Sequence, residues 1–581
     1  MAENGEVNIF LFREEKYTMK VIIVGGVAGG ASAAARLRRL DEKAEIVVFE
    51  RTGYISYANC GLPYYIGGTI DDPEELTLQT PESFFSRFRV DMRVHHEVID
   101  IDAAAKTVRV KNLESGEEFT ESYDKLILSP GAKSTVPPIS GVDNSRVFSL
   151  RTVEDTFRIK DFIDSASPRS AVIVGGGFIG MEMAENLREK GLEVTIVERL
   201  NQLMSPFDRD MVSFIHGEAR EQGIKLVLGA GVQGFEEAEK GLNVLIEGAP
   251  SIAADMVIMA IGVTPDTALA RAAGLELGIR GSILVNDRME TSAADIYAVG
   301  DAVQVRHSVS GKDVLLSLAG PANKQGRIAA DNICGGDSRY KGSQGSSVLK
   351  FFSLTAACTG LNEAGAKAAG FDTDKVILSP MSHAGYYPGG KVMTVKLVFE
   401  KGTYRILGAQ IIGYEGVDKR IDVIATAIHA GLKATELTEL DLAYAPPYSS
   451  AKDPVNMAGF MAENIAKGVL KQWFVEDEPA LPRDGSVILL DTRTPREYDA
   501  GHADGFINIP VDELRQRIAE VEKGKKVYVM CHSGIRSYIA CRILEGEGYE
   551  AYNFSGGYRF FSAVKNDLRL HEKSSPCGMD A

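Results

Sequence analysis

One unit occurs twice in the sequence and constrains the fold more than any other feature. It consists of an apolar segment, a glycine-rich turn, an alanine-bearing helical segment, a second apolar segment and a glutamate. The first copy reads VIIVGGVAGGASAAARLRRL followed by EIVVFE, and the second reads AVIVGGGFIGMEMAENLREKG followed by EVTIVE. The hydrophobic period changes from strand to helix and back, which predicts a βαβ unit in each copy. We therefore expect an α/β fold with two Rossmann-like units.

The second copy matches the dinucleotide-binding pattern in full. A bound pyrophosphate needs free N–H groups at a helix start, glycines that allow a close approach, and a carboxylate for a ribose hydroxyl. The turn is formed by Gly175, Gly177 and Gly180, and Glu198 supplies the carboxylate. Because a carboxylate repels a 2′-phosphate, Glu198 favours NADH over NADPH. Arg199 follows directly and softens this preference.

The first copy departs from the pattern, because Val27 stands where the middle glycine belongs. Gly25 and Gly30 keep the outer positions, and Glu50 ends the next strand 20 residues after Gly30. That spacing still suits a dinucleotide. A tight structural turn is the alternative for either copy, but the agreement of strand, turn, helix, strand and acid favours nucleotide binding.

Length and composition indicate a soluble protein of several domains. The 581 residues exceed a single hydrophobic core. The expected organisation is a discontinuous first nucleotide unit over 19–150 and 274–345, a second over 151–273, an α+β unit over 346–465, a linker over 466–484, a compact α/β unit over 485–570 and a tail over 571–581.

Charge and cysteine content exclude several classes of function. The formal net charge of -16 disfavours nucleic acid as a partner. No stretch reaches the ~20 apolar residues of a membrane helix, and residues 1–18 lack the features of a secretion signal. The 6 cysteines are too few for a disulfide scaffold and form no CxxC metal pair. We expect a cytoplasmic protein with reduced thiols, no metal and no membrane partner.

Cys60 lies in SYANCGLPYYIGG, soon after Glu50. The Gly and Pro residues of this segment predict a loop near the first nucleotide. From the residue alone, a buried structural thiol is the simpler interpretation. Next to a redox cofactor, however, a single thiol can attack a disulfide.

Several separated motifs resemble the single-cysteine pyridine nucleotide disulfide oxidoreductases, in particular the coenzyme A disulfide reductases. They are GGVAGG, SYANCGLPY, YDKLILSPGA, GGGFIG, AIGVTPD and DIYAVGD, and the match covers about residues 20–465. The resemblance implies FAD on the first unit, NAD(P)H on the second and Cys60 as the redox-active nucleophile. Besides the second glycine-rich turn, the nucleotide-binding residues would be Gly25, Ala28, Gly29, Gly30, Glu50, Arg51, Asp301 and Gly262.

The same resemblance implies a coenzyme A site. Its residues would be Ser32, Arg36, Arg39, Ser56, Asn59, Asn323 and Lys452. Basic side chains suit the phosphates of coenzyme A. Arg36 and Arg39 stand at i and i+3 and can share one helix face, although a solvated surface explains them equally well.

Two tyrosines are candidates for catalysis across a dimer. SHAGYYPGG and LAYAPPYSSAKD resemble family segments whose tyrosines reach toward the partner's cysteine, and Tyr386 and Tyr444 match them. A phenol there stabilises a departing thiolate. Without the resemblance, ordinary core packing is the simpler interpretation. A catalytic role would make the enzyme an obligate homodimer.

A second reactive cysteine is expected at Cys531. The strand VYVM runs into CHSGIRS, so N–H groups of a short loop converge on the sulfur, and Arg536 favours a thiolate. LLDTRTPREYDAGHADGFINIP, CHSGIRS and FSGGYRF resemble rhodanese domains, over about residues 485–562. A cysteine phosphatase has a similar loop and is the alternative, which the DxR strand disfavours.

Together these features predict an FAD-dependent enzyme that uses NADH to reduce persulfide, polysulfide or coenzyme A persulfide or disulfide at Cys60. The rhodanese domain would handle sulfane sulfur at Cys531. A coenzyme A disulfide reductase proper and an NADH oxidase are the enzymatic alternatives, and a redox-sensing interaction protein is the non-enzymatic one. The other thiols are expected to be core residues or, for the last, part of the tail: Cys334, Cys358, Cys541 and Cys577.

Overall fold

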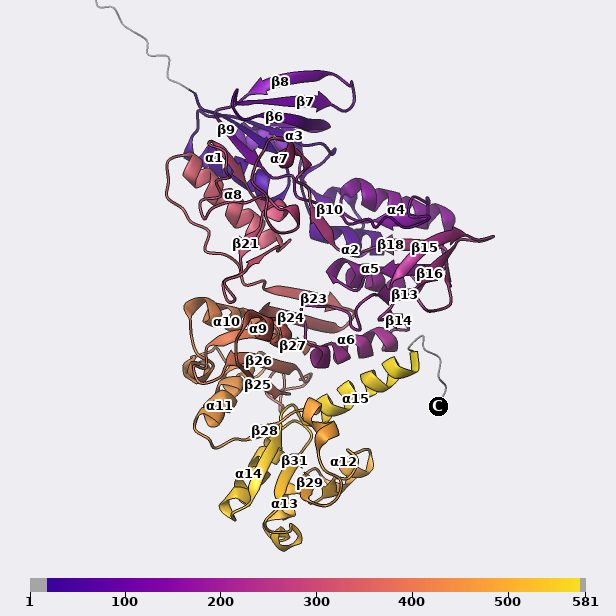
Figure 1. Cartoon of the computed structure of the whole chain (residues 1–581), viewed down its shortest axis with the longest axis vertical. Helices are drawn as coiled ribbons and strands as arrows, with labels where there is room; N and C mark the ends of the chain where they lie inside the picture. Colours follow the sequence, from indigo (N-terminus) through magenta and orange to yellow (C-terminus); the bar gives the residue numbers. More distant parts are fainter. Residues whose placement is uncertain (1–17, 575–581) are drawn as a thin grey trace, which may run out of the picture.

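In the computed structural model, each repeated unit forms the centre of its own five-stranded parallel sheet (Figure 1). The strand orders are β20-β9-β1-β2-β5 and β11-β18-β12-β13-β14, so the strands of the two repeats occupy equivalent places. The strands are apolar along their length because both faces of each sheet are covered. Their bounds are β1 (Lys20–Val24), β2 (Glu45–Phe49), β5 (Asp91–Arg93), β9 (Lys125–Leu128), β20 (Ile296–Ala298), β11 (Val147–Ser149), β12 (Ser170–Val174), β13 (Glu193–Glu198), β14 (Lys225–Leu228) and β18 (Met256–Met259).

The structure describes residues 18–574. Residues 1–17 and 575–581 lie outside the described part. The prediction about residues 1–18 and the one about Cys577 therefore fall almost entirely outside the described residues. Among the described residues, none of the helices combines the length and apolar character needed to span a membrane.

Helices and antiparallel meanders complete the two nucleotide units. On the first sheet, α1 (Ala28–Leu40) packs against α8 (Ala319–Ile333), and on the second α5 (Phe178–Glu189) follows the glycine-rich turn. The remaining elements are β3 (Ile55–Tyr57), α2 (Leu62–Gly67), β4 (Thr77–Gln79), α3 (Pro81–Phe88), β6 (His96–Asp102), β7 (Thr107–Asn112), β8 (Glu118–Ser122), β10 (Ala132–Ser134), α4 (Val153–Ala166), α6 (Arg209–Glu221), β15 (Val232–Glu237), β16 (Leu242–Ile246), β17 (Ile252–Ala254), β19 (Val263–Pro265), α7 (Ala268–Ala272), β21 (Val305–Arg306) and β22 (Asp313–Val314).

The third unit is α+β, as predicted. Its antiparallel sheet has the order β23-β24-β27-β26-β25, and two helices, α10 and α11, pack on it. The bounds are β23 (Ser347–Phe351), β24 (Leu354–Gly360), α9 (Glu363–Ala369), β25 (Thr373–Leu378), β26 (Thr394–Glu400), β27 (Ile406–Gly413), α10 (Val417–Ala430) and α11 (Pro454–Ala466).

The C-terminal unit is a parallel sheet of order β28-β32-β31-β29-β30. Its elements are β28 (Gln472–Trp473), β29 (Val487–Asp491), α12 (Pro495–Asp499), β30 (Ile507–Asn508), α13 (Val511–Leu514), β31 (Lys526–Met530), α14 (Ile535–Gly546), β32 (Glu550–Phe554) and α15 (Gly557–Ser574).

Two expected boundaries of this unit are wrong. The middle of the expected linker, 466–484, contains β28, which pairs with β32. The Trp473 ring is buried there, with its centroid 4.4 Å from that of Phe554, because a large apolar ring gains more from the core than from a solvated linker. The expected tail also begins too early, since α15 continues to Ser574.

The C-terminal unit docks on the second nucleotide unit through α15, which lies along α6 (Figure 1). The buried Asp567 carboxylate binds Arg209, Arg220 at 2.6 Å and the His216 ring at 2.9 Å. Burial alone would raise the pKa of Asp567, but the bonds and charges of these three partners hold it well below the usual range. A single carboxylate thus balances much of the positive charge on α6.

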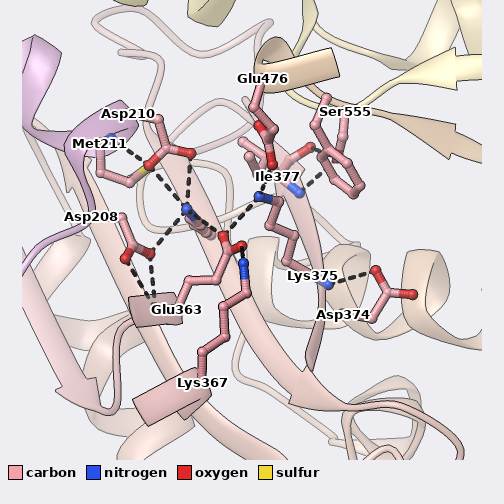
Figure 2. A network of polar contacts seen from close by, with 12 residues as sticks. Asp208, Asp210, Met211, Glu363, Lys367, Asp374, Lys375, Ile377, Glu476 and Ser555 are labelled. Atoms are coloured by element: carbon pink, nitrogen blue, oxygen red, sulfur yellow. Dashed lines mark hydrogen bonds and ion pairs between the residues drawn. The ribbon is translucent and has the colours of Figure 1, made fainter. Parts of the chain in front are cut away.

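A second charged network lies where three units meet, as Figure 2 shows. The buried Nζ of Lys396 on β26 lies 2.8 Å from Asp210 at the start of α6 and 3.3 Å from Glu363 on α9. Lys375 on β25 binds Glu363 at 2.7 Å and Glu476 of the C-terminal unit. Burial opposes the charge of Lys396, but the surrounding carboxylates outweigh it and raise the pKa of its ammonium group. These contacts fix the C-terminal unit on the rest of the chain.

Replacing Asp567 with Asn is expected to lower the free energy of unfolding of the C-terminal unit by about 3 kcal/mol, because Arg209 and Arg220 lose a buried counter-charge. Trp473, the single tryptophan, reports this unfolding by fluorescence in urea. The stabilisation from a depressed pKa is present above the unfolded pKa of about 4 and is lost as the pH falls through the folded value. The difference in the free energy of unfolding between the wild type and Asp567→Asn should therefore become smaller in acid.

Asp512→Asn, on the exposed side of α13, is the matched control and should leave the urea midpoint unchanged. An Asp567→Asn midpoint equal to that of the control would contradict the role of this carboxylate in docking.

Candidate active sites

The first glycine-rich turn presents an open helix start. Gly25 has a φ of 97°, and a Cβ on Gly30 would lie 1.9 Å from the Gly25 carbonyl oxygen, so only glycine fits. No side chain caps α1, which leaves its first N–H groups available to a phosphate. The Glu50 carboxylate accepts the Gly26 N–H at 2.8 Å and thereby lies beside the turn.

The second turn repeats this geometry. Gly175 has a φ of 109°, and a Cβ on Gly180 would lie 2.0 Å from the Gly175 carbonyl oxygen. Gly177 precedes α5 without a side-chain cap. Glu198, at the end of β13, accepts the Gly176 N–H at 2.8 Å. Both turns therefore bring the same three features to one place: free N–H groups, room for a phosphate and a carboxylate.

The other expected nucleotide-binding residues surround the turns. They are Ala28, Gly29, Arg51, Asp301 and Gly262. Asp301 follows β20 and accepts Arg151 at 2.7 Å, while Arg51 binds Asp266 at 2.8 Å. Gly262, between β18 and β19, has a φ of 106°.

Cys60 lies in a 3-10 turn, Asn59–Gly61, and not in the expected loop. Pro63 explains the difference, because proline is favoured in the first turn of a helix and α2 begins at Leu62. The Cys60 side chain is exposed. Partial desolvation and then the charge of Glu182 raise the pKa of its thiol, while Arg151 opposes them. The neighbouring side chains therefore favour the neutral thiol.

Glu182 acts electrostatically on Cys60 and was not among the residues that the sequence interpretation named. It lies on α5, and burial, with a smaller contribution from Glu185, raises its pKa to about 7. A carboxyl group that titrates near neutrality beside a nucleophile suits proton exchange. The available signal was an acid five residues after Gly177, within the glycine-rich motif itself.

A cleft of about 420 Å³ beside α1 brings most of the expected coenzyme A residues together. Those in its lining are Ser32, Arg36, Arg39, Ser56 and Asn323. Asn59 and Lys452 do not line it; Asn59 adjoins Cys60, and Lys452 lies just before α11. The cleft and Cys60 are linked through the short segment from Ser56 to Cys60.

Two further arginines of this cleft were not predicted. Arg87 on α3 and Arg327 on α8 also line it. Together with Arg39 they are three exposed guanidinium groups that bind no carboxylate among the described residues. Unpaired guanidinium groups around one cleft favour a phosphate-bearing ligand. No local pattern marks them, because they come from separate segments.

Tyr386 and Tyr444 lie on the third unit, and their hydroxyl groups are 2.6 Å apart. Tyr386 is 76% exposed and Tyr444 45%, so core packing is the wrong interpretation. Neither is among the groups that act on Cys60 of the same chain. They are left available for contacts outside the chain.

Cys531 follows β31 and is fully buried. The Gly534 N–H donates to its sulfur at 3.1 Å and the Ser537 hydroxyl at 3.2 Å, so the expected cradle is present. Arg536 binds both oxygens of Glu497 at 2.7 Å, which fixes its guanidinium group near the loop. Such a cradle suits an anionic sulfur. The thiolate state itself stays a prediction.

The remaining thiols differ in burial. Cys358 and Cys541 are buried, as expected for core residues, and burial raises the pKa of both. Cys334 is only half-buried, because it caps the end of α8 at the edge of the first unit.

Two dinucleotide turns, an exposed thiol on the first nucleotide unit and a separate sulfur cradle define a pyridine nucleotide-dependent oxidoreductase joined to a sulfur-transfer unit. The chain belongs to the pyridine nucleotide-disulphide oxidoreductase family, whose profile matches residues 19–326. The dimerisation domain of that family matches residues 346–454, and a rhodanese-like domain matches residues 478–563. The last match also makes the cysteine phosphatase alternative wrong.

The chain is similar to proteins that share this architecture. Coenzyme A disulfide reductase from Staphylococcus aureus strain JH9 is 36% identical over 445 residues, which is 76% of this chain and 100% of that protein. The reduced CoADR-RHD of Bacillus anthracis is 48% identical with a TM-score of 0.92, covering 95% of this chain and 99% of that one. An NAD-dependent persulfide reductase from A. fulgidus is 36% identical with a TM-score of 0.89, covering 94% and 100%.

The family implies FAD and NAD(P)H, and the residues present fit both. Each turn combines an uncapped helix start, a glycine that no side chain can replace and a carboxylate at the end of the adjacent strand. FAD would be held at the first turn with Glu50 and Asp301, and NAD(P)H at the second with Glu198.

Glu182→Gln is expected to lower the pKa of the Cys60 thiol and to raise its alkylation rate about threefold at pH 8, because a negative charge is removed. The difference should fade below about pH 7, where Glu182 takes up a proton. Iodoacetamide labelling of the reduced holoenzyme, with Cys60 quantified by peptide mass spectrometry, measures it. Glu193→Gln, at the exposed start of β13, is the control. Identical labelling profiles for both variants would remove Glu182 from the site.

Proposed function

We propose that the protein uses NADH to reduce the sulfur–sulfur bond of a persulfide, a polysulfide or a coenzyme A persulfide or disulfide at Cys60. The rhodanese domain handles sulfane sulfur at Cys531. The observation that carries this proposal is the exposed Cys60 thiol, four residues after Ser56, which lines the arginine-bearing cleft and donates its backbone N–H to Gly26 of the first nucleotide turn. The two similar proteins named for coenzyme A disulfide and persulfide reduction support the same substrate class.

The chemistry at Cys60 is a thiol–disulfide exchange. The Cys60 thiolate attacks one sulfur of the substrate, the substrate's S–S bond breaks, and the other sulfur leaves as a thiolate or hydrosulfide. Glu182, whose charge acts on Cys60 and whose pKa is about 7, would accept the Cys60 proton and return one to the leaving sulfur. Bound FAD would supply the two-electron chemistry that restores the thiol.

Coenzyme A, free or as part of the substrate, would occupy the cleft beside α1. Arg39, Arg87 and Arg327 offer unpaired guanidinium groups to its phosphates. Ser56 lines the cleft, and Asn59 adjoins Cys60, so the thiol end of the ligand would lie near the nucleophile. In this arrangement one ligand would contact both the arginines and Cys60.

A homodimer would complete the site. Tyr386 and Tyr444 are exposed and bonded to each other, and Lys452 is also exposed on the same unit. We infer that these side chains approach the partner subunit's Cys60, where a phenol hydroxyl donates to the leaving thiolate. The family's dimerisation domain supports this arrangement. A cytoplasmic location would keep both reactive thiols reduced.

Cys60→Ser is expected to retain FAD and to lose NADH-dependent polysulfide reduction by at least about a thousandfold, because none of the described cysteines can replace the nucleophile. Anaerobic NADH oxidation with polysulfide or coenzyme A disulfide measures this loss. Cys334→Ser, on the same unit and half-buried, is the control and should remain active. Polysulfide turnover by Cys60→Ser would reject the nucleophile, and turnover that requires oxygen would favour an NADH oxidase.

Cys531→Ser is expected to abolish thiosulfate sulfurtransferase activity while reduction of small persulfides at Cys60 largely survives. The cradle of Gly534 and Ser537 acts only on Cys531, and Cys60 belongs to a separate unit. Cys541→Ser, buried in the same domain, is the matched control. Equal loss of both activities in a folded, FAD-replete Cys531→Ser protein would show that Cys531 lies on an obligatory route.

Glu198→Ala is expected to reduce the NADH-over-NADPH ratio of kcat/KM by about tenfold, because a ribose partner and a charge opposed to the 2′-phosphate are removed. Glu193→Ala, at the exposed start of the same strand, is the control. A ratio that Glu198→Ala leaves unchanged would assign the preference to other residues, with Arg199 the first to examine.

A further inference from the structure

A second cleft, of about 470 Å³, lies where the C-terminal unit meets the rest of the chain. It is lined by residues of α6, of β24 and β27 with the turn after β27, and of α15, elements that converge in Figure 1. None of its lining residues belongs to the coenzyme A cleft or to either glycine-rich turn. Its volume is in the range of small-ligand sites.

Arg559 on α15 is a half-buried cation of this cleft with no carboxylate partner among the described residues. One guanidinium nitrogen donates to the Thr394 hydroxyl at 2.8 Å, and the guanidinium carbon lies 4.8 Å from the centre of the Phe214 ring. Among the described residues no carboxylate binds it. Burial lowers its pKa, which Tyr414 partly opposes. A positive charge in this setting is desolvated without compensation.

The other charged residues of the cleft do not supply that compensation. Asp567 is bound by Arg209, His216 and Arg220, and Glu218 accepts hydrogen bonds from neighbouring side chains. Glu221, the third carboxylate of the lining, forms no ion pair with Arg559, and none of the three carboxylates is among the groups that act on it. The guanidinium group of Arg559 therefore keeps a positive charge that no carboxylate of the cleft pairs with.

We propose that this cleft binds an anion that offers at least two acceptor oxygens, an oxyanion or a carboxylate, on the Arg559 guanidinium. Arg559 uses one nitrogen for Thr394, which leaves further N–H donors for a two-point contact. The Tyr414 hydroxyl, also in the lining, provides a second donor. The volume admits a ligand of metabolite size behind the anionic group.

Arg559 connects the cleft to two neighbouring parts of the chain, the other units and the loop of Cys531. Arg559 reaches Thr394 and Phe214, which belong to the third and second units, so a bound anion joins these units to α15. The backbone N–H of Arg559 donates to the backbone carbonyl of His532, the residue after Cys531, at 3.2 Å. An anion at Arg559 would therefore stabilise the docked C-terminal unit directly beneath the sulfur-carrying loop.

The test uses the FAD-loaded full chain saturated with coenzyme A, which occupies the other arginine-lined cleft. Sodium sulfate is compared with sodium chloride at equal ionic strength, and the thermal midpoint is recorded. Because sulfate stabilises proteins in general, the informative quantity is the difference between variants. The proposal expects a saturable rise of at least about 2 °C in the wild type and in Arg515→Gln, an exposed arginine of the same unit, and no saturable rise in Arg559→Gln.

Two readouts remain decisive if Arg559→Gln fails to fold. Tyr414→Phe keeps the guanidinium group and should raise the half-saturating sulfate concentration about threefold. Crystals of the wild type soaked in selenate should show an anomalous peak between Arg559 and Tyr414. The titration is then repeated with thiosulfate, in the Cys531→Ser background, and with inorganic phosphate. Tighter binding of thiosulfate would identify a sulfur oxyanion as the ligand, and tighter binding of phosphate a phosphorylated metabolite.

An equal saturable rise in Arg559→Gln would overturn the proposal. So would a Tyr414→Phe titration identical to the wild type together with selenate peaks confined to the cleft of Arg39, Arg87 and Arg327.

Discussion

In both nucleotide units a helix begins very close to the carboxyl end of the preceding strand. Only glycine, which has no Cβ atom, allows this approach, and the rest of each unit depends on it. At Gly30 and Gly180 a Cβ would meet the carbonyl oxygen of the turn's first glycine at 1.9 and 2.0 Å. This contact sets the position of α1 and α5 on their sheets, and with them the arginine-lined cleft beside α1 and Glu182 on α5. The chemistry at Cys60 thus depends on backbone geometry fixed elsewhere in the chain.

Buried charges provide the second constraint, because they hold the C-terminal unit in one place. Asp567 lies among three cationic or ionisable groups of α6, and Lys375 joins Glu363 to Glu476. When one partner of such a pair is removed, the other charge stays buried without a partner. The resulting loss of stability is larger than the net stabilisation that the intact pair contributes. The result is a sulfur-transfer loop with a defined orientation on the reductase, and a cleft with an uncompensated arginine at the junction.

The repeated βαβ pattern, the α+β third unit and the cradle of Cys531 were predictable from sequence, because each depends on local periodicity or on neighbouring residues. The linker prediction failed at Trp473, since pairing of β28 with a strand about 80 residues later leaves no local signal. Arg87 and Arg327 were missed for the same reason: only the tertiary structure brings them to one cleft. Glu182 was readable from its motif, but its raised pKa depends on burial.

The most direct test of the central claim is an anaerobic titration of the Cys531→Ser holoenzyme with NADH, after charging with polysulfide and removing the excess. A sulfur–sulfur bond at Cys60 accepts two electrons in addition to those taken by FAD. We therefore expect uptake of about two equivalents of NADH per FAD, with release of hydrogen sulfide. Uptake of about one equivalent, with no sulfide released, would contradict it.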